Sequence, residues 1–158
     1  MIRAYHAVCT SAMCANKRVL VASMGNPLID YDSIAYRVVE SLPDLSFIRK
    51  VHLFADPLSL VAIYRDEDGI ILVDVCDSDK IHVMDAEEIY RVESKGISSH
   101  VIGIRSAMEI LNLTNHRISH IQKIFVFFPS GKHNSEKMKF FSSMLMDIIR
   151  DFSARCIE

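Results

Sequence analysis

The feature that most constrains the fold of this chain is an almost unbroken apolar run from Ile70 to Val75, in which Asp74 is the one polar residue. Four of its six residues are β-branched. A strand that is apolar on both faces is typical of the middle of a parallel sheet that helices cover on both sides. Half of the 158 residues are hydrophobic, which suits a core shielded on both faces. We therefore expect an α/β fold built around this strand.

Strand-like and helix-like segments alternate along the rest of the chain. The expected strands are residues 18–23, 50–54, 70–75, 81–85 and 123–128, and the expected helices are residues 32–42, a short turn after Asp56-Pro57, residues 100–113 and a last helix from Ser135 to Phe152. Because right-handed helical crossovers join parallel strands, the prediction is a three-layer α/β/α sandwich with a mostly parallel, twisted sheet of about five strands and helices on both faces. Residues 17–158 are expected to form this single domain, residues 1–16 a loosely held N-terminal extension, and His116 and His120 part of a polar loop.

Charge and hydropathy exclude several kinds of partner. The 18 basic and 20 acidic residues give a net charge of −2, which provides no electrostatic basis for binding nucleic acid or an anionic membrane. No apolar run approaches the roughly 18 residues that a membrane span needs, and residues 1–17 lack the apolar centre of a secretory signal. The four cysteines form no Cys-x-x-Cys pair and fit reduced thiols. We expect a cytoplasmic protein, favoured as a monomer.

A turn with the sequence Gly25-Asn26-Pro27 ends the first expected strand. The glycine and the asparagine tolerate positive φ, and the proline fixes the direction in which the chain leaves. Asp30, Asp32 and Ser33 follow as candidate caps of the next helix. The turn therefore delivers a carboxylate to the end of a strand, where open α/β sheets hold their ligands.

Two later segments send further polar side chains toward the same edge of the sheet. Asp32 follows the first expected strand, Asp74 lies near the end of the third, and His100 opens the helix after the fourth. Two carboxylates and an imidazole suit a three-ligand site with open positions for a divalent ion. Taken singly, each residue also fits a structural role: a helix cap for Asp32, a loop cap for Asp74 and a backbone-bonded histidine for His100.

At these residues the chain resembles the hydrogenase maturation endopeptidases, which trim the large subunit of nickel–iron hydrogenases. The resemblance runs from Arg18 to about Ser130 and rests on three signatures in order. These are Gly25-Asn26-Pro27-Leu28 followed by Asp32 and the helix Tyr36-Arg37-Val38-Val39-Glu40, the apolar strand that ends near Asp74, and the segment Ser98-Ser99-His100 before the next helix. The resemblance implies that Asp32, Asp74 and His100 are the catalytic, metal-contacting residues.

The activity that this resemblance implies is a nickel-dependent, metal-assisted endopeptidase of the aspartic type, with no serine or cysteine nucleophile. Such an enzyme recognises nickel already inserted into the precursor of the hydrogenase large subunit and removes a C-terminal extension from it. The nickel is therefore expected to arrive with the substrate, and other divalent ions are expected to occupy the site in vitro. Whether the metal polarises the scissile carbonyl or activates a water stays open.

Three departures from the family pattern surround these residues. Tyr31 stands where an acid is common, the segment Phe54-Ala55-Asp56-Pro57-Leu58-Ser59 replaces a glycine-rich Asp-Gly-Gly-Thr segment, and Phe128 stands where a polar residue is common. A non-catalytic hydrogenase assembly or accessory binding protein on the same scaffold is therefore the alternative function. Small-molecule or nucleotide binding at the sheet edge rests on fold analogy alone.

Overall fold

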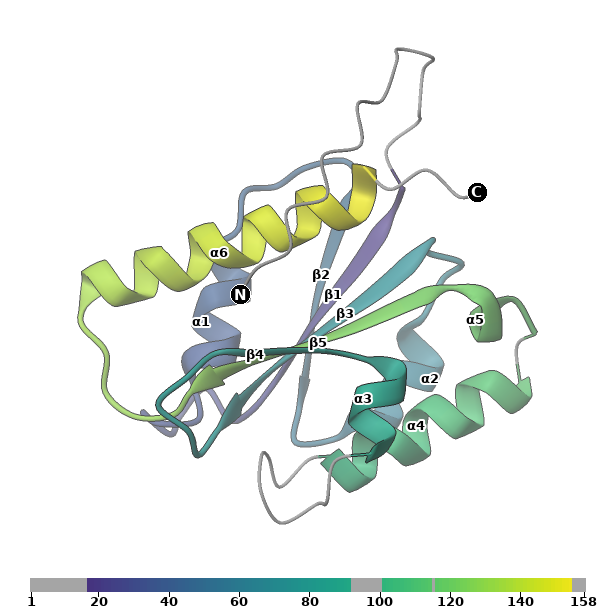
Figure 1. Cartoon of the computed structure of the whole chain (residues 1–158), viewed down its shortest axis with the longest axis horizontal. Coiled ribbons are helices and arrows are strands. Elements are labelled where there is room, and N and C mark those ends of the chain that lie inside the picture. Colours follow the sequence, from purple (N-terminus) through teal and green to yellow (C-terminus); the bar gives the residue numbers. More distant parts are fainter. Residues whose placement is uncertain (1–16, 92–100, 115, 155–158) are drawn as a thin grey trace.

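The computed structural model describes residues 17–91, 101–114 and 116–154. In chain order the elements are β1 (Val19–Met24), α1 (Ile34–Glu40), β2 (Ile48–Phe54), the 3-10 helix η1 (Pro57–Ser59), α2 (Leu60–Ile63), β3 (Gly69–Cys76), β4 (His82–Asp85), α3 (Ala86–Arg91), α4 (Val101–Thr114), α5 (His116–His120), β5 (Gln122–Pro129) and α6 (Ser135–Ala154) (Figure 1). The expected N-terminal extension, residues 1–16, lies outside the described residues.

A five-stranded sheet in the order β2-β1-β3-β5-β4 forms the middle of the molecule. The pairs β1–β2, β1–β3 and β3–β5 are parallel, and β4 pairs with β5 in the antiparallel direction. Every residue of β3 is buried. The apolar run from Ile70 to Val75 thus lies in the central strand, as the sequence predicts.

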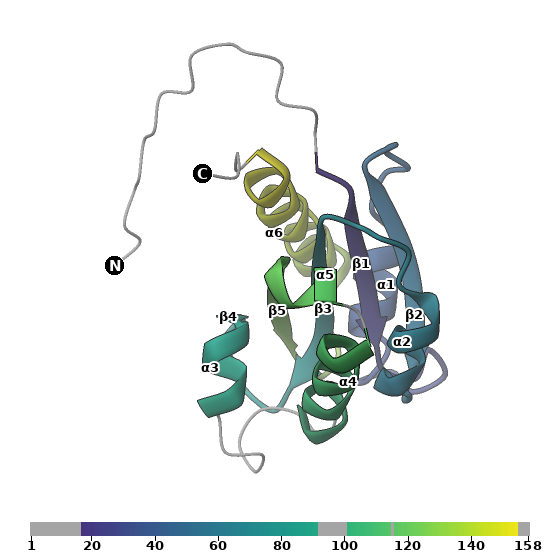
Figure 2. The same cartoon turned by 90° about the vertical axis from the view of Figure 1, so that its right-hand side faces the viewer.

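Helices cover both faces of this sheet. Figures 1 and 2 show α1 and α6 on one side and α2, α3 and α4 on the other. Side chains of β3 alternate between the layers: Ile71 and Val73 join the core beneath α1 and α6, whereas Ile70 and Leu72 join the core beneath α2 and α4. The three-layer α/β/α prediction is confirmed.

The last helix, α6, packs on the sheet through an apolar stripe at helical spacing. Phe141, Leu145, Ile149 and Phe152 are all buried on it. At its end, the Phe152 ring lies directly over Gly69 at the start of β3, where an added Cβ would fall 1.9 Å from Phe152 Cζ. Within the described ranges, neither α6 nor any other helix has the length and apolar character that crossing a membrane requires.

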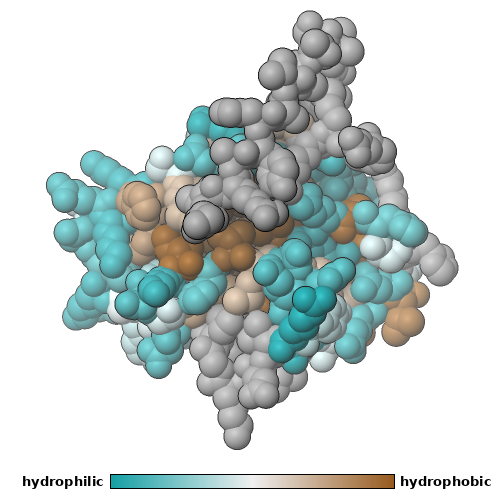
Figure 3. All heavy atoms as spheres, in the orientation of Figure 1, coloured by the Kyte–Doolittle hydropathy of each residue, from teal (hydrophilic) through white to brown (hydrophobic). Residues whose placement is uncertain are grey.

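The edge strand β4 is covered on one side only. Val83 pairs with Val126, whose side chain belongs to the core beneath α1 and α6, yet Val83 is 45% exposed. On the face seen in Figure 1, apolar residues accordingly gather between α6 and the sheet, within a mostly hydrophilic surface (Figure 3).

Two local expectations are wrong. The segment from His116 to His120 is the short helix α5 rather than a polar loop, and Ile118 from it is buried in the core beneath α4. Helix α1 begins at Ile34 rather than at Asp32. Its start is later because Asp32 belongs to the turn that precedes the helix.

Candidate functional site

The candidate site lies at the edge where the parallel strands β1, β2, β3 and β5 end. In the register between β1 and β3, Ser23 lies opposite Val73, so Asp74 comes level with the end of β1. The loop that follows β1 carries Asp32. Both carboxylates predicted from the sequence therefore lie at the carboxyl edge of the sheet, where open α/β folds bind ligands.

Asp32 holds the turn after β1 in shape. Its Oδ2 accepts a hydrogen bond of 2.6 Å from the backbone N–H of Asn26. Gly25 has a φ of +105°, and a Cβ on it would lie 2.3 Å from the Asp32 carbonyl oxygen. Only glycine combines this backbone conformation with so close an approach. The carboxylate is thereby folded back over the turn rather than onto the first turn of α1.

The cap of α1 is not provided by a side chain. Ser33 occupies the N-cap position but makes no side-chain hydrogen bond to the helix, because its Oγ donates to the carbonyl of Asp30. The expectation that Asp30, Asp32 or Ser33 caps this helix is therefore wrong for the side chains. The polar side chains of the loop bond to the backbone of the loop itself, which fixes the position of Asp32.

Asp74 is buried, with 1% of its surface exposed. Its Oδ1 accepts a hydrogen bond of 2.8 Å from the N–H of Val75. Strand alternation places it on the face of the sheet that α4 covers, together with Leu72 and Cys76. Taking a carboxylate out of water costs several kcal/mol. A carboxylate in such a position is a candidate for a functional group.

Cys76 lies two residues beyond Asp74 on the same face. Burial, and after it the negative charge of Asp74, raise the pKa of the Cys76 thiol to about 11. A nucleophilic cysteine needs the opposite, a lowered pKa that yields thiolate at neutral pH. Cys76 is therefore an inert core residue.

His100, the third predicted ligand, lies outside the described residues. The helix α4 begins directly after it in the chain, at Val101. A Cβ on Gly103 would lie 2.5 Å from Cγ of Pro57, so the first turn of α4 packs against η1, just after the end of β2. The start of α4 therefore reaches the same edge as Asp32 and Asp74.

One step of the prediction for His100 is wrong, because it assumed that the strand before this helix runs parallel to its neighbours. A strand parallel to its neighbours would end at the carboxyl edge, but β4 runs antiparallel to β5, from His82 opposite Phe127 to Asp85 opposite Ile124. It ends toward the other edge, so β4 itself does not lead to the carboxyl edge, where α4 begins. Among the residues described, no three His, Cys, Asp or Glu side chains are grouped so that they could hold a metal.

Three hydrogen-bonded side chains lie in a row beside this edge, and the sequence does not predict them. Ser23 Oγ lies 2.6 Å from His52 Nδ1, and His52 Nε2 lies 2.9 Å from Glu40 Oε2. The Tyr36 ring packs on the imidazole with its centroid at 4.3 Å. Ser23 is 2% exposed, and its hydroxyl is already engaged by His52. The chain of contacts instead ties β1, β2 and α1 together below the Gly25 turn.

Exposed apolar side chains lie in the loop that carries Asp32, at the end of β2 and in η1. Leu28 is 91% exposed and Phe54 is 53% exposed, and Tyr31 and Leu58 are also exposed. The two loops meet where the N–H of Gly25 donates a 2.7 Å hydrogen bond to the Phe54 carbonyl. We call Leu28, Tyr31, Phe54 and Leu58 the apolar rim.

Phe54 adopts a rare backbone conformation within this rim. Its φ is +51°, in the left-handed region that a bulky residue seldom occupies. The strand register also shifts there, because Ser23 lies opposite His52 but Met24 lies opposite Phe54. Such irregularities re-aim side chains and are frequent next to active sites. Here the bulge places an aromatic ring in solvent at the start of the segment that stands in place of the glycine-rich segment expected from the family resemblance.

Comparisons with known proteins find relatives in structure only. No protein-family model matches the chain, and neither does a curated protein. The chain matches the NiFe hydrogenase maturation protease HybD from Thermococcus kodakarensis with a TM-score of 0.70 and 20% identity, over 86% of this chain and 99% of that one. It matches the hydrogenase maturating endopeptidase HybD from E. coli with a TM-score of 0.67 and 18% identity, over 85% and 93%.

A second protease from Thermococcus kodakarensis gives the same result. The NiFe hydrogenase maturation protease HycI matches with a TM-score of 0.63 and 15% identity, over 89% of this chain and 94% of that one. These comparisons show that the chain has the fold of the hydrogenase maturation proteases, over nearly their whole length.

Proposed function

We propose that this chain, which shares the fold of the hydrogenase maturation proteases, is itself an endopeptidase that removes a C-terminal extension from the precursor of a nickel–iron hydrogenase large subunit after nickel insertion. The observation that carries the proposal is the pair Asp32 and Asp74, found at the carboxyl edge of this fold. The first two signatures in the sequence carry these carboxylates, and the third signature carries His100, the third proposed ligand.

The proposed chemistry uses nickel that belongs to the substrate. Carboxylate oxygens and an imidazole nitrogen are competent ligands for a divalent ion. Asp32, Asp74 and His100 would complete the coordination of a nickel ion already held by the precursor. Hydrolysis then adds water across one peptide bond, with the metal polarising the carbonyl or activating the water.

The alternatives for a nucleophile close to Asp74 are poor. The raised pKa of Cys76 keeps this thiol protonated at neutral pH, and Ser23 is buried against His52. Both observations support a water as the attacking group. They agree with a protease that has no serine or cysteine nucleophile.

The apolar rim supports a protein as the substrate. Leu28 and Phe54 expose large apolar side chains in the rim beside the loop that carries Asp32. Such side chains lose contact with water when a partner covers them, which is favourable by about 25 cal/mol per Å². An apolar segment of the precursor would pack on the rim while its chain end reaches Asp32 and Asp74.

The rim is also the observation that favours the second candidate, a non-catalytic assembly protein. Phe54 and the residues after it replace glycines that give the backbone freedom beside the site. A protein that only holds the precursor would need the docking surface but not the freedom of that loop. The proposed protease and this alternative bind the same partner.

Incubation with purified, nickel-loaded precursor distinguishes the two candidates. The protease shortens the precursor, and a nickel-free precursor stays intact because the metal is missing. The assembly protein co-purifies with both forms and shortens neither. Gel mobility of the large subunit together with co-purification reads out both properties in a single experiment.

A further inference from the structure

A pocket of about 200 Å³ opens at the amino ends of β1 and β2. Its lining includes Arg18, Arg49 and Arg65, together with Glu67 and Phe47. Asp74 lies seven positions after Glu67, which corresponds to roughly 23 Å along an extended chain. The pocket therefore lies at the opposite edge of the sheet from the candidate protease site.

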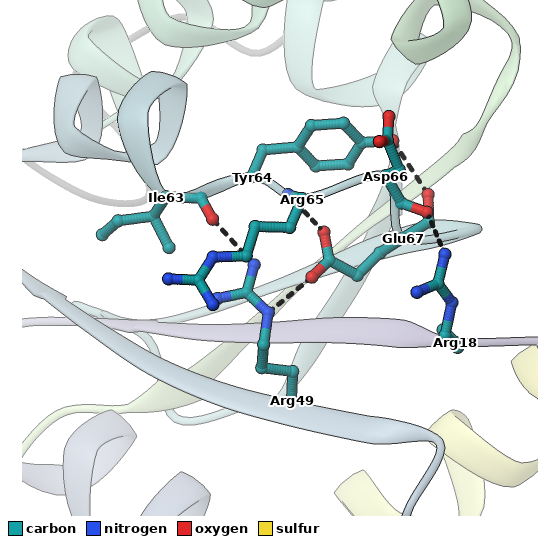
Figure 4. A network of polar contacts seen from close by, with 7 residues as sticks. All are labelled: Arg18, Arg49, Ile63, Tyr64, Arg65, Asp66 and Glu67. Carbon is teal, nitrogen blue, oxygen red and sulfur yellow. Dashed lines mark hydrogen bonds and ion pairs between the residues drawn. The ribbon is translucent and has the colours of Figure 1, made fainter.

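One buried carboxylate organises this pocket (Figure 4). Glu67 is 4% exposed, and it forms an ion pair with Arg49 through Nε of the guanidinium. Its other oxygen accepts a 2.9 Å hydrogen bond from the backbone N–H of Arg65. Burial alone raises the pKa of Glu67, but the hydrogen bonds from Arg49 and Arg65 outweigh it and the net pKa is lowered. Glu67 is therefore ionised and already has its partners.

The backbone around Glu67 holds the arginines in place. Arg49 Nη2 donates to the Ile63 carbonyl at 2.8 Å, and Arg18 Nη2 donates to the Asp66 carbonyl at 2.7 Å. The backbone N–H of Arg18 also donates a hydrogen bond of 2.8 Å to Asp68 Oδ2. Both guanidinium groups are thus held in place by backbone carbonyl oxygens, and Glu67 also pairs with the charge of Arg49.

Arg65 differs from the other two arginines. Its side chain extends toward the Arg49 guanidinium (Figure 4). Within the described part of the chain, the Arg65 guanidinium has no hydrogen-bond or ion-pair partner, although it lines the pocket. Cations that line one pocket repel each other unless anions lie between them. Three guanidinium groups share this pocket with one lining carboxylate, Glu67, which pairs with Arg49.

We propose that this pocket binds the phosphate group of a small ligand. The lining carries three guanidinium cations and one carboxylate, an excess of positive charge that Asp68, bonded to the backbone N–H of Arg18, offsets only in part. A phosphate ester carries about 1.5 to 2 negative charges at pH 7 and would pair with the remaining cations. Guanidinium groups bind phosphate oxygens with two parallel hydrogen bonds. The volume suits a phosphate with a small organic group, for which Phe47 forms an apolar wall.

Isothermal titration calorimetry of the full chain with inorganic phosphate at pH 7.5 tests this site. The wild-type protein should bind one phosphate saturably. Arg65→Gln keeps the backbone N–H that bonds to Glu67 but removes the unpartnered charge, so the affinity should fall at least tenfold. Arg150→Gln is the matched control, because Arg150 is an exposed arginine paired with Asp147 on α6, and its affinity should equal that of the wild type.

Acetate is the second probe, since a carboxylate carries one charge and two oxygens. It should bind at least tenfold more weakly than phosphate. Absence of saturable binding by the wild type, equal losses in Arg65→Gln and Arg150→Gln, or equal affinity for acetate and phosphate would each overturn the proposal. Circular dichroism of Arg65→Gln should match the wild type. The inference does not depend on the protease activity, so either can fail alone.

Discussion

At the scale of single residues, the two carboxylates of the candidate site are held by different backbone N–H groups, Asp32 by Asn26 and Asp74 by Val75. Asp74 stands out because it interrupts an apolar strand, and it is indeed buried at the carboxyl edge. Asp32 is also at that edge, yet its contact is with the N–H of Asn26 rather than with α1. The contact depends on the fold of the whole turn, which no short pattern specifies.

Gly25 should be far less tolerant of substitution than Gly131. Both have positive φ, at +105° and +115°, but a Cβ on Gly131 meets no atom within 4 Å, whereas one on Gly25 meets the Asp32 carbonyl. Gly131→Ala should therefore cost only the backbone term of about 1–2 kcal/mol. Gly25→Ala should cost at least about 1 kcal/mol more in urea unfolding, because the turn must also move away from Asp32. Equal losses would contradict the close approach.

The ion pair of Glu67 should make stability depend on acid pH. Its folded pKa lies below the unfolded value of about 4.3. A lowered pKa contributes stability that is fully present above the unfolded value and is lost as pH falls through the folded one. Urea unfolding of the wild type and of Glu67→Gln should therefore show a smaller loss for the variant between pH 5 and pH 3. Parallel curves would show that Glu67 is not linked to folding.

At the scale of elements, hydrophobic periodicity is sufficient to locate most strands and helices. It does not determine direction or register. The short strand β4 gives no sequence signal for its antiparallel pairing, and the Ser23–His52–Glu40 chain exists only because β1 and β2 pair in one register. The sequence pattern does not predict α5, because five residues are too few to show a helical period. Ile118 within this helix is nevertheless buried.

The contact between α6 and β3 should couple Gly69 to Phe152. Gly69→Ala places a methyl group within the Phe152 ring, and such overpacking typically costs 1–3 kcal/mol. Phe152→Leu alone loses packing but makes room at the same place. In thermal or urea unfolding, the double variant should therefore be less destabilised than the sum of the two single variants by about 1 kcal/mol or more. Additive losses would mean that the ring does not lie over Gly69.

At the scale of the whole molecule, the resemblance in sequence and the likeness in structure agree. Signatures spread from Gly25 to His100 predict the fold of the hydrogenase maturation proteases, and the chain has that fold. The apolar rim could not be predicted, because it depends on a bulge in β2 and on the left-handed conformation of Phe54. Local sequence shows only that the glycines are absent.

The rim predicts a trade-off between stability and binding. Phe54→Gly relieves a strained φ of +51° and should raise the free energy of unfolding by about 1 kcal/mol. The same change removes an exposed ring from the rim and should weaken binding of the precursor. Leu113→Ser removes another exposed apolar side chain, at the far end of α4, and should leave precursor binding unchanged. If Phe54→Gly binds the precursor as the wild type does, the rim is not the docking surface.

We propose that Asp74 takes part in the nickel-dependent cleavage of a hydrogenase large subunit. Its most direct test is the intact mass of a nickel-loaded precursor before and after incubation with the wild type, Asp74→Asn and the control Asp44→Asn, whose carboxylate is exposed and pairs with Lys50. We predict one discrete loss of mass at the C-terminus with the wild type and with Asp44→Asn, and no loss with a folded Asp74→Asn or with nickel-free precursor. An unchanged mass with the wild type and a verified nickel-loaded precursor would contradict the claim.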